Sequence, residues 1–337
     1  MKPQPSGGFE WVQAAGGTAL VCGALRPFAD HLFTTREWAL GSRAEAADED
    51  WQAVAASLGV DAAHLVRLHQ VHGATSLVRR AGERAPEAGR PDADIVVSND
   101  ASLALAIQTA DCVSLLIADR VTGAIAAAHA GWRGLAAGVP GVTIDALTRE
   151  FGGTPENLIA AVGPSICAER YEVGEDVRAR FVAAGFSDAQ LARWFLQGAR
   201  PGHWQFDGWR SVSDQLESAG VQPGDIHIAG LCTATFPDLL CSYRRDGKGA
   251  GRIAAAIRFC RPLARAAVPR TALHDTGRPP DAGPVVTPPS PRRAPSSRAG
   301  ARRPSPRSTR WWNARSMPRT TTTARGGSRR WVKEQTR

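Results

Sequence analysis

Three runs of apolar residues between positions 103 and 130 constrain the fold of this 337-residue chain more than any other feature. They read LALAIQ (103–108), VSLLIAD (113–119) and AIAAAHA (124–130). Each run has the usual length of a strand and is far shorter than the roughly 18 apolar residues that indicate a membrane-spanning helix. Thr122 and Gly123 stand between the second and third runs, where they predict a tight turn. The pattern predicts consecutive buried strands and no membrane partner.

The rest of the first 260 residues mixes further strands with helices. LIAAVG (158–163) and DIHIAGLC (225–232) are typical of buried strands, and helical patterns cover 44–59, 171–185 and 209–220. The last two helical patterns end on a glycine, as a helix C-cap often does. Because strands and helices do not alternate in a strict βαβ order, we expect the α+β class rather than a doubly wound sheet.

Positive charge is concentrated at the C-terminal end of the chain. Residues 261–337 carry 18 Lys and Arg against three acidic residues, whereas residues 1–260 carry 23 Lys and Arg against 29 acidic residues. The first 260 residues are therefore mildly acidic, which argues against a nucleic-acid-binding core.

Residues 271–337 contain ten prolines but only five residues of Leu, Ile, Val, Met and Phe. Such a segment buries too little apolar surface to offset its ordering entropy, so we expect a disordered basic tail over 261–337. With 38 arginines and three lysines in the chain, a frame-shifted reading of GC-rich DNA would produce this composition. A basic arm that binds nucleic acid weakly is the alternative interpretation.

Six cysteines are scattered along the chain without a CxxC pair, and the N-terminus lacks the apolar segment of a signal peptide. We therefore expect a cytoplasmic protein with reduced thiols; the oligomeric state stays open.

Three short segments carry residues that can bind a metal ion: His72 in LHQVHG (68–73), Cys112 at the end of TADC (109–112) and His129 in HAGWRG (129–134). The strands at TADC and HAGWRG are separated by one tight turn, so we expect Cys112 and His129 to be neighbours. Two imidazoles and one thiolate suit Zn²⁺ or copper, and three protein ligands leave a position open for water or substrate.

These segments also resemble the sequence motifs of a known family. QVHG, TADC, HAGWRG, AVGPSIC (161–167), YEVGEDV (171–177) and CSYRRDGKGAGRIAAAI (241–257) occur in the order typical of the multicopper polyphenol oxidase, or laccase-domain, family. This is the YfiH/YlmD-like group, whose members are described as purine nucleoside phosphorylases. The resemblance divides the chain into 1–27 (an N-terminal extension or first strands), a catalytic domain over 28–260, and the tail. It implies a layered α/β sandwich with mixed sheets, shared with the cytotoxic-necrotizing-factor-like cysteine hydrolases.

By the same resemblance, His72, Cys112 and His129 are the metal ligands, and His69 has no such role. The implied activity is phosphorolysis of adenosine, inosine and S-methyl-5′-thioadenosine to the free base and ribose 1-phosphate, with some adenosine deamination. Zinc, with copper as the alternative, is the implied metal, and phosphate is the cosubstrate.

Two other enzyme classes remain as alternatives. A Cys–His amidohydrolase editing peptidoglycan precursors would use Cys112 as nucleophile and His129 as base. A copper-dependent polyphenol oxidase would need several copper ions, whereas one His₂Cys site holds one, and the sequence has no His-x-His pair.

The remaining candidate residues are charged. Arg36, Arg133 and Arg244, with its neighbour Arg245, could bind phosphate, because guanidinium groups match oxyanions; surface ion pairs are the simpler interpretation. Asp111 is expected to orient a metal ligand or donate a proton, unless it is only a solvated acid at a strand end.

Overall fold

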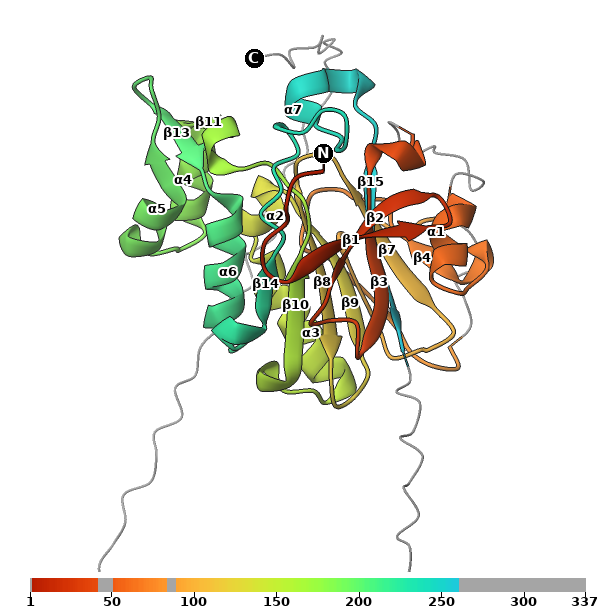
Figure 1. Cartoon of the computed structure of the whole chain (residues 1–337). Coiled ribbons are helices and arrows are strands. Elements are labelled where there is room, and N and C mark those ends of the chain that lie inside the picture. The colour runs from red at the N-terminus through yellow and green to blue at the C-terminus, as the bar shows by residue number, and fades with distance from the viewer. Residues whose placement is uncertain (1, 42–50, 84–88, 261–337) are drawn as a thin grey trace, which may run out of the picture. The chain divides into compact units, whose positions relative to one another are not determined.

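Two six-stranded sheets pack face to face in the computed structural model, which describes residues 2–41, 51–83 and 89–260 (Figure 1). In the first sheet the strand order is β1 (Phe9–Ala14), β2 (Gly17–Cys22), β3 (Ala29–Thr34), β15 (Ile253–Phe259), β7 (Ala104–Thr109) and β4 (Leu65–Arg67). In the second it is β14 (Ile226–Ile228), β10 (Leu158–Val162), β8 (Val113–Asp119), β9 (Ile125–Ala130), β6 (Ile95–Ser98) and β5 (Ser76–Arg79). Both sheets contain parallel and antiparallel pairs.

The central strands are mostly apolar because both of their faces are buried. In β8, Leu116 faces the core between the two sheets, whereas Leu115 and Ile117 face the core on the other side of the second sheet. In β7, Leu105 and Ile107 point into the same inter-sheet core. Side chains alternate between the two faces of a strand, so a strand covered on both faces is apolar at most positions. The few polar side chains of β8, Ser114 and Asp119, are themselves buried.

Helices cover the two outer faces and complete a four-layer sandwich. The second sheet is covered by α3 (Val139–Phe151) and α6 (Gly208–Ser218), whose apolar residues share one core with β8 and β9. The first sheet is covered by the short helix α1 (Gln52–Ser57). The layered α/β sandwich with mixed sheets is therefore the observed fold.

A smaller lobe stands beside α6 (Figure 1). It contains the three-stranded sheet β11 (Glu172–Gly174), β13 (His203–Phe206) and β12 (Phe195–Gln197), with helices α4 (Glu175–Ala183) and α5 (Asp188–Trp194). Phe181 lies at its centre and contacts the rings of Trp194, Phe195 and Phe206 at centroid distances of 5.2–6.0 Å. This aromatic packing fixes α4 with respect to Tyr171, which borders the candidate site described below.

The predicted strands are present, with two differences. Although β7 and β8 follow one another in the chain, they belong to different sheets, and the strand expected over 225–232 ends at Ile228. The predicted turn is confirmed, since Gly123 has a φ of +75° between β8 and β9.

The helical patterns are confirmed in part. The pattern over 209–220 corresponds to α6, and Gly220 follows it with a φ of +98°. In the pattern over 171–185, Glu172–Gly174 is instead a strand paired with β13, and the helix begins after Gly174. Residues 44–50 of the first pattern and the expected disordered tail, 261–337, lie outside the described residues.

Within the described ranges, no helix combines the length and the apolar character that crossing a bilayer requires.

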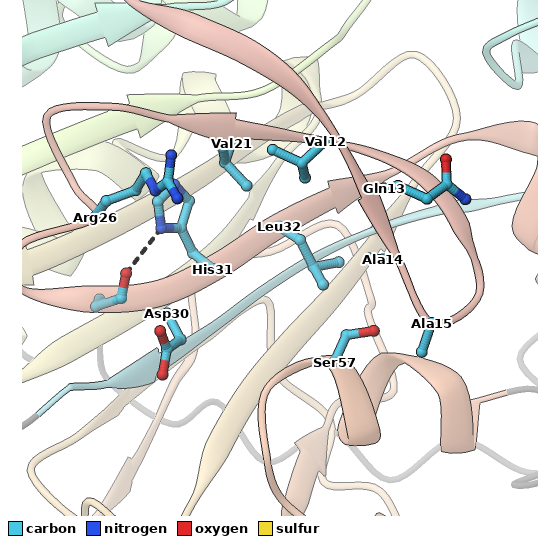
Figure 2. Close-up of a pocket in the computed structure, with 11 residues that line it drawn as sticks. Val12, Gln13, Ala14, Ala15, Val21, Arg26, Asp30, His31, Leu32 and Ser57 are labelled. Atoms are coloured by element: carbon cyan, nitrogen blue, oxygen red, sulfur yellow. Dashed lines mark hydrogen bonds between the residues drawn. The ribbon is translucent and has the colours of Figure 1, made fainter.

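His31 in β3 is a buried titratable group in the first sheet, beside the pocket shown in Figure 2. Its Nδ1–H donates to the carbonyl of Ala29 at 2.9 Å, and its Nε2 accepts the N–H of Cys22 at 2.8 Å. Both nitrogens are engaged in a neutral ring. Burial outweighs the Ala29 carbonyl and lowers the pKa of His31 to about 4.

We predict that His31 makes the folded state less stable as the pH falls from about 6.5 towards 4. In that window the unfolded state binds a proton at His31 and the folded state does not. At about 1.4 kcal/mol per pKa unit, the loss approaches 3 kcal/mol. The measurement is urea unfolding at pH 7 and pH 4.5 for the wild type, His31→Gln and a control at an exposed histidine, His64→Gln. The His31 variant should lose less stability on acidification than the other two; equal losses in all three would contradict the assignment.

Candidate metal centre

His72, Cys112 and His129 come together from three separate segments. One nitrogen or sulfur atom from each lies within 4.8 Å of the others. The rings of the two histidines are nearly perpendicular, at 86°, with centroids 4.8 Å apart. His72 lies in the loop between β4 and β5, Cys112 lies in the crossover from β7 to β8, and His129 belongs to β9.

The β8–β9 hairpin explains why Cys112 and His129 are neighbours. Its register pairs Val113 with Ala130 and Ser114 with His129, so the residue before β8 lies next to the end of β9. The expected neighbourhood is present, but Cys112 does not end a strand: β7 ends at Thr109, and Cys112 precedes β8. This crossover carries the chain from the first sheet to the second.

Asp94 organises the centre and was missed in the sequence. It lies directly before β6 and is fully buried. One carboxylate oxygen accepts the Nδ1–H of His129 at 2.8 Å and the N–H of His72 at 3.0 Å. The other accepts the N–H groups of Gly73 at 2.6 Å and Val71 at 3.3 Å. A metal-binding histidine usually donates its second ring N–H to such a carboxylate. An acid followed by a buried strand after Pro91 is the sequence signal that could have pointed to Asp94.

Hydrogen bonds to Asp94 also set its charge. Burial alone would raise the pKa of this carboxyl, but the hydrogen bonds from His129 and Gly73 outweigh it and lower the pKa. A carboxylate can only accept hydrogen bonds, so Nδ1 of His129 carries a proton. Nε2 is therefore the nitrogen that faces the other two metal-binding side chains, His72 and Cys112.

Two residues of the site have left-handed backbone conformations that are uncommon outside glycine. His72 has a φ of +62° and Asp111 a φ of +88°. The N–H groups on either side of His72 bond to Asp94, which holds this conformation. Strain of this kind persists where the surroundings determine the backbone strongly, and it is frequent at functional sites.

Asp111 holds a second loop in place. Its carboxylate accepts the hydroxyl of Thr233 and the backbone N–H of Arg244, each at 2.6 Å. Among the described residues, no hydrogen bond joins this carboxylate to His72, Cys112 or His129. Asp111 is therefore a buried, partnered acid, and not the solvated strand-end acid of the simpler interpretation.

The electrostatics of the centre favour an ionised thiol. Burial would raise the pKa of Cys112, but the charge of His129 and hydrogen bonds from both histidines lower it to about 6. Burial would lower the pKa of His129, but the Cys112 charge and the bond to Asp94 raise it to about 9. Without a metal ion, Cys112 and His129 therefore form a thiolate–imidazolium pair. Thiolate is the form that binds metals or attacks electrophiles, and His129 would release its Nε2 proton on binding a metal.

Gly131 makes room for the Cys112 sulfur. A Cβ added at Gly131 would lie 2.9 Å from that sulfur and 3.3 Å from the His72 ring. The sulfur cannot move away without leaving the two histidines, so a glycine is required at this position of HAGWRG.

A pocket of about 390 Å³ opens over the three metal-binding side chains, His72, Cys112 and His129. Its wall includes Tyr171, Tyr243 and Arg244. The Arg244 guanidinium lies 4.8 Å from the centre of the Tyr171 ring and donates to the carbonyl of Glu172 at 2.8 Å. Burial, with the nearby Cys112 charge, raises the pKa of Tyr171 well above its usual value, so its phenol is neutral.

The other candidate arginines lie in different surroundings. Arg36 donates to Asp246 at 2.6 Å and does not line this pocket. Arg245 donates to the carbonyls of Thr233 and Leu240, so it supports the loop. Arg133 lines an adjoining pocket that shares His72.

The three donors fit a zinc ion in type and spacing. At Zn–N distances of about 2.1 Å and Zn–S distances of about 2.3 Å, tetrahedral ligand atoms lie roughly 3.3–3.8 Å apart. The separations here, all within 4.8 Å, require only small side-chain adjustments. In the part of the chain that the structure describes, this is the one group of three or more metal-binding side chains.

Known proteins are similar to this chain in both sequence and fold. The purine nucleoside phosphorylase of Deinococcus radiodurans is 43% identical over 204 residues, covering 60% of this chain and 74% of its own. Purine nucleoside phosphorylase YfiH of Escherichia coli is 38% identical over 192 residues, covering 57% and 72%. The crystal structure of YlmD from Geobacillus stearothermophilus superposes with a TM-score of 0.64 at 26% identity, covering 74% of this chain and 99% of that one.

The family model described as multi-copper polyphenol oxidoreductase laccase matches residues 34–260. That span includes every donor of the centre, and the chain belongs to this family.

Proposed function

We propose that this chain is a purine nucleoside phosphorylase acting in the pocket above His72, Cys112 and His129. Its substrates would be adenosine, inosine and S-methyl-5′-thioadenosine. The relatives named purine nucleoside phosphorylase support the reaction class. The observation that carries the proposal is the pocket itself, which combines two tyrosine side chains, two arginines (Arg244 and Arg252) and the three metal-binding side chains in about 390 Å³.

The reaction transfers the ribosyl group from the base to phosphate. An oxygen of phosphate forms a bond to C1′, the C1′–N9 bond breaks, and its electron pair leaves with the base, which takes up a proton. Tyr171 and Tyr243 offer aromatic surfaces for the base. We assign phosphate binding to arginines, of which Arg244 lines this pocket and Arg133 the adjoining one, whereas Arg36 already has Asp246 as its partner.

We propose that His72, Cys112 and His129 hold one zinc ion, with copper as the alternative. When bound, zinc supplies Lewis-acid chemistry and lowers the pKa of a water to about 7, which would also permit adenosine deamination. Asp94 orients His129 and the backbone of His72, and Asp111 positions the backbone of Arg244 at the pocket wall.

We place the protein in the cytoplasm, since all six of its cysteines are free thiols in the structure.

Replacing Cys112 by Ala should abolish stoichiometric zinc binding, because two imidazoles alone hold the ion weakly. The fold should persist, since only a side chain bordering a pocket is lost. Metal analysis of the purified protein, with a melting curve, measures both. Cys260→Ala, at the end of β15, is the matched control and should keep its zinc. An undiminished zinc content in the Cys112 variant would contradict the assignment of Cys112 as a zinc ligand.

Asp94→Asn should weaken zinc binding by about 10–100-fold, the usual effect of losing a carboxylate behind a metal-binding histidine. The amide nitrogen cannot accept hydrogen bonds, so His129 or the His72 loop loses its partner. Affinity is measured by competition with a chelator. Asp92→Asn is the control, because Asp92 is exposed and bonds to His69 instead. Equal affinities in the two variants would argue against the role of Asp94.

The reaction itself is tested with adenosine and phosphate. Release of adenine should require phosphate, yield ribose 1-phosphate in equal amount, and fall on chelation. Formation of inosine would reveal the deaminase activity. Adenine release that is independent of phosphate would contradict phosphorolysis.

One observation favours a second candidate, a Cys–His amidohydrolase. Asp94, His129 and Cys112 form a chain in which a carboxylate orients an imidazole next to a thiolate. Nucleophile, base and orienting group follow one another in this way in cysteine hydrolases. Cys112 would attack an amide carbonyl, for example in a peptidoglycan precursor, and His129 would protonate the leaving amine.

Alkylation of Cys112 separates the two candidates. A metal ion occupies the lone pair of the thiolate, so iodoacetamide should label the zinc-loaded protein slowly and the chelated protein quickly. Labelling is followed by mass spectrometry of the Cys112 peptide. Fast labelling of the zinc-loaded protein, with no ribose 1-phosphate formed from adenosine, would favour the hydrolase.

A further inference from the structure

A second cavity, of about 370 Å³, adjoins the metal centre on the side of α2 (Trp132–Ala136). His72 lines both this cavity and the pocket above the donors. Its lining also includes Trp132, Arg133 and Arg180, and the rest of it consists of four alanines at the C-terminal ends of α2 and α4. The alanines leave space and offer no polar side chain. No carboxylate lines the cavity.

The two arginines of this cavity lack counter-ions. Within the described residues, neither the Arg133 nor the Arg180 guanidinium makes a hydrogen bond or an ion pair. Arg178, two residues earlier on another face of the same helix, behaves differently: it pairs with Glu175 and lies over the ring of Trp204. Two unpaired positive charges at one cavity repel each other and attract an anion.

One of these guanidinium groups lies over an aromatic ring. The Arg133 guanidinium lies 4.3 Å from the centre of the Trp132 ring. Contact with an indole uses the face of the guanidinium and leaves its N–H groups free along the edge. That edge matches two oxygens of a phosphoryl group.

We propose that this cavity binds a phosphoryl dianion through Arg133 and Arg180. The proposal rests on the proposed function to the extent that phosphate is its cosubstrate, and it adds Arg180 as a binding residue. Because the cavity meets the metal centre at His72, the bound group would lie beside the nucleoside pocket. Two sources share this chemistry: inorganic phosphate, and the phosphate of a nucleoside 5′-monophosphate whose nucleoside part occupies the pocket.

Calorimetric titration of the full-length, zinc-loaded protein tests the site. Inorganic phosphate, adenosine 5′-monophosphate and adenosine are titrated at constant ionic strength into the wild type, Arg180→Gln and the matched control Arg178→Gln. Each variant loses one charge from the same helix, and each retains the 18 basic residues of 261–337. Non-specific anion binding by that segment is therefore equal in all three proteins.

We expect Arg180→Gln to weaken binding of at least one phosphoryl ligand by about tenfold or more, the cost of a lost hydrogen bond to a charged group. Adenosine binding and the Arg178→Gln protein should be unaffected. Weaker binding of inorganic phosphate identifies the cosubstrate as the source; weaker binding of the monophosphate alone identifies a nucleotide. Equal affinities of both phosphoryl ligands for the wild type and Arg180→Gln would overturn the site.

Failure of this proposal is distinguishable from failure of the proposed function. Normal formation of ribose 1-phosphate by a variant with unchanged phosphate affinity would reject the cavity and keep the phosphorylase. Conversely, weakened phosphate binding in Arg180→Gln, with no ribose 1-phosphate formed even by the wild type, would keep the cavity and reject phosphorolysis.

Discussion

The buried Asp94 carboxylate is the interaction on which the candidate site depends. It accepts hydrogen bonds from the His129 ring and from the backbone around His72, so it joins β9 to the β4–β5 loop. A buried carboxylate without such donors would cost several kcal/mol. Its four hydrogen bonds instead keep it ionised and hold His72 in a left-handed conformation. One acid thereby fixes two of the three metal-binding residues, His72 and His129.

The site also depends on the junction between the two sheets. Cys112 lies where the chain passes from β7 in the first sheet to β8 in the second, and His129 lies on the strand paired with β8. Asp111, in the same crossover, ties it to a second loop, because its carboxylate accepts hydrogen bonds from the Thr233 hydroxyl and the backbone N–H of Arg244. The position of the sulfur therefore follows from the packing of one sheet on the other.

Features that depend on local pattern could be predicted from the sequence, and features that depend on distant pairing could not. The apolar runs of β7, β8 and β9 were evident because both faces of these strands are buried. The proximity of Cys112 and His129 followed from a short turn. By contrast, Glu172–Gly174 looked helical because its partner, β13, lies some thirty residues later. Asp94 was missed because one of two acids shortly after Pro91 resembles a loop residue until the four N–H groups that bind it are known.

The position of β15 makes completion of the first sheet a late event. Among the described strands, Ile253–Phe259 is the one that pairs with both β3 and β7, so it joins the β1–β3 part of the sheet to the β7–β4 part. Until it is synthesised, β3 and β7 are open edges, which are prone to pairing with other chains. The sheet whose strand β7 ends beside the centre thus depends for its completion on residues more than 140 positions downstream of Cys112. A chain emerging from the ribosome therefore exposes the edges of β3 and β7 until residues 253–259 have been synthesised.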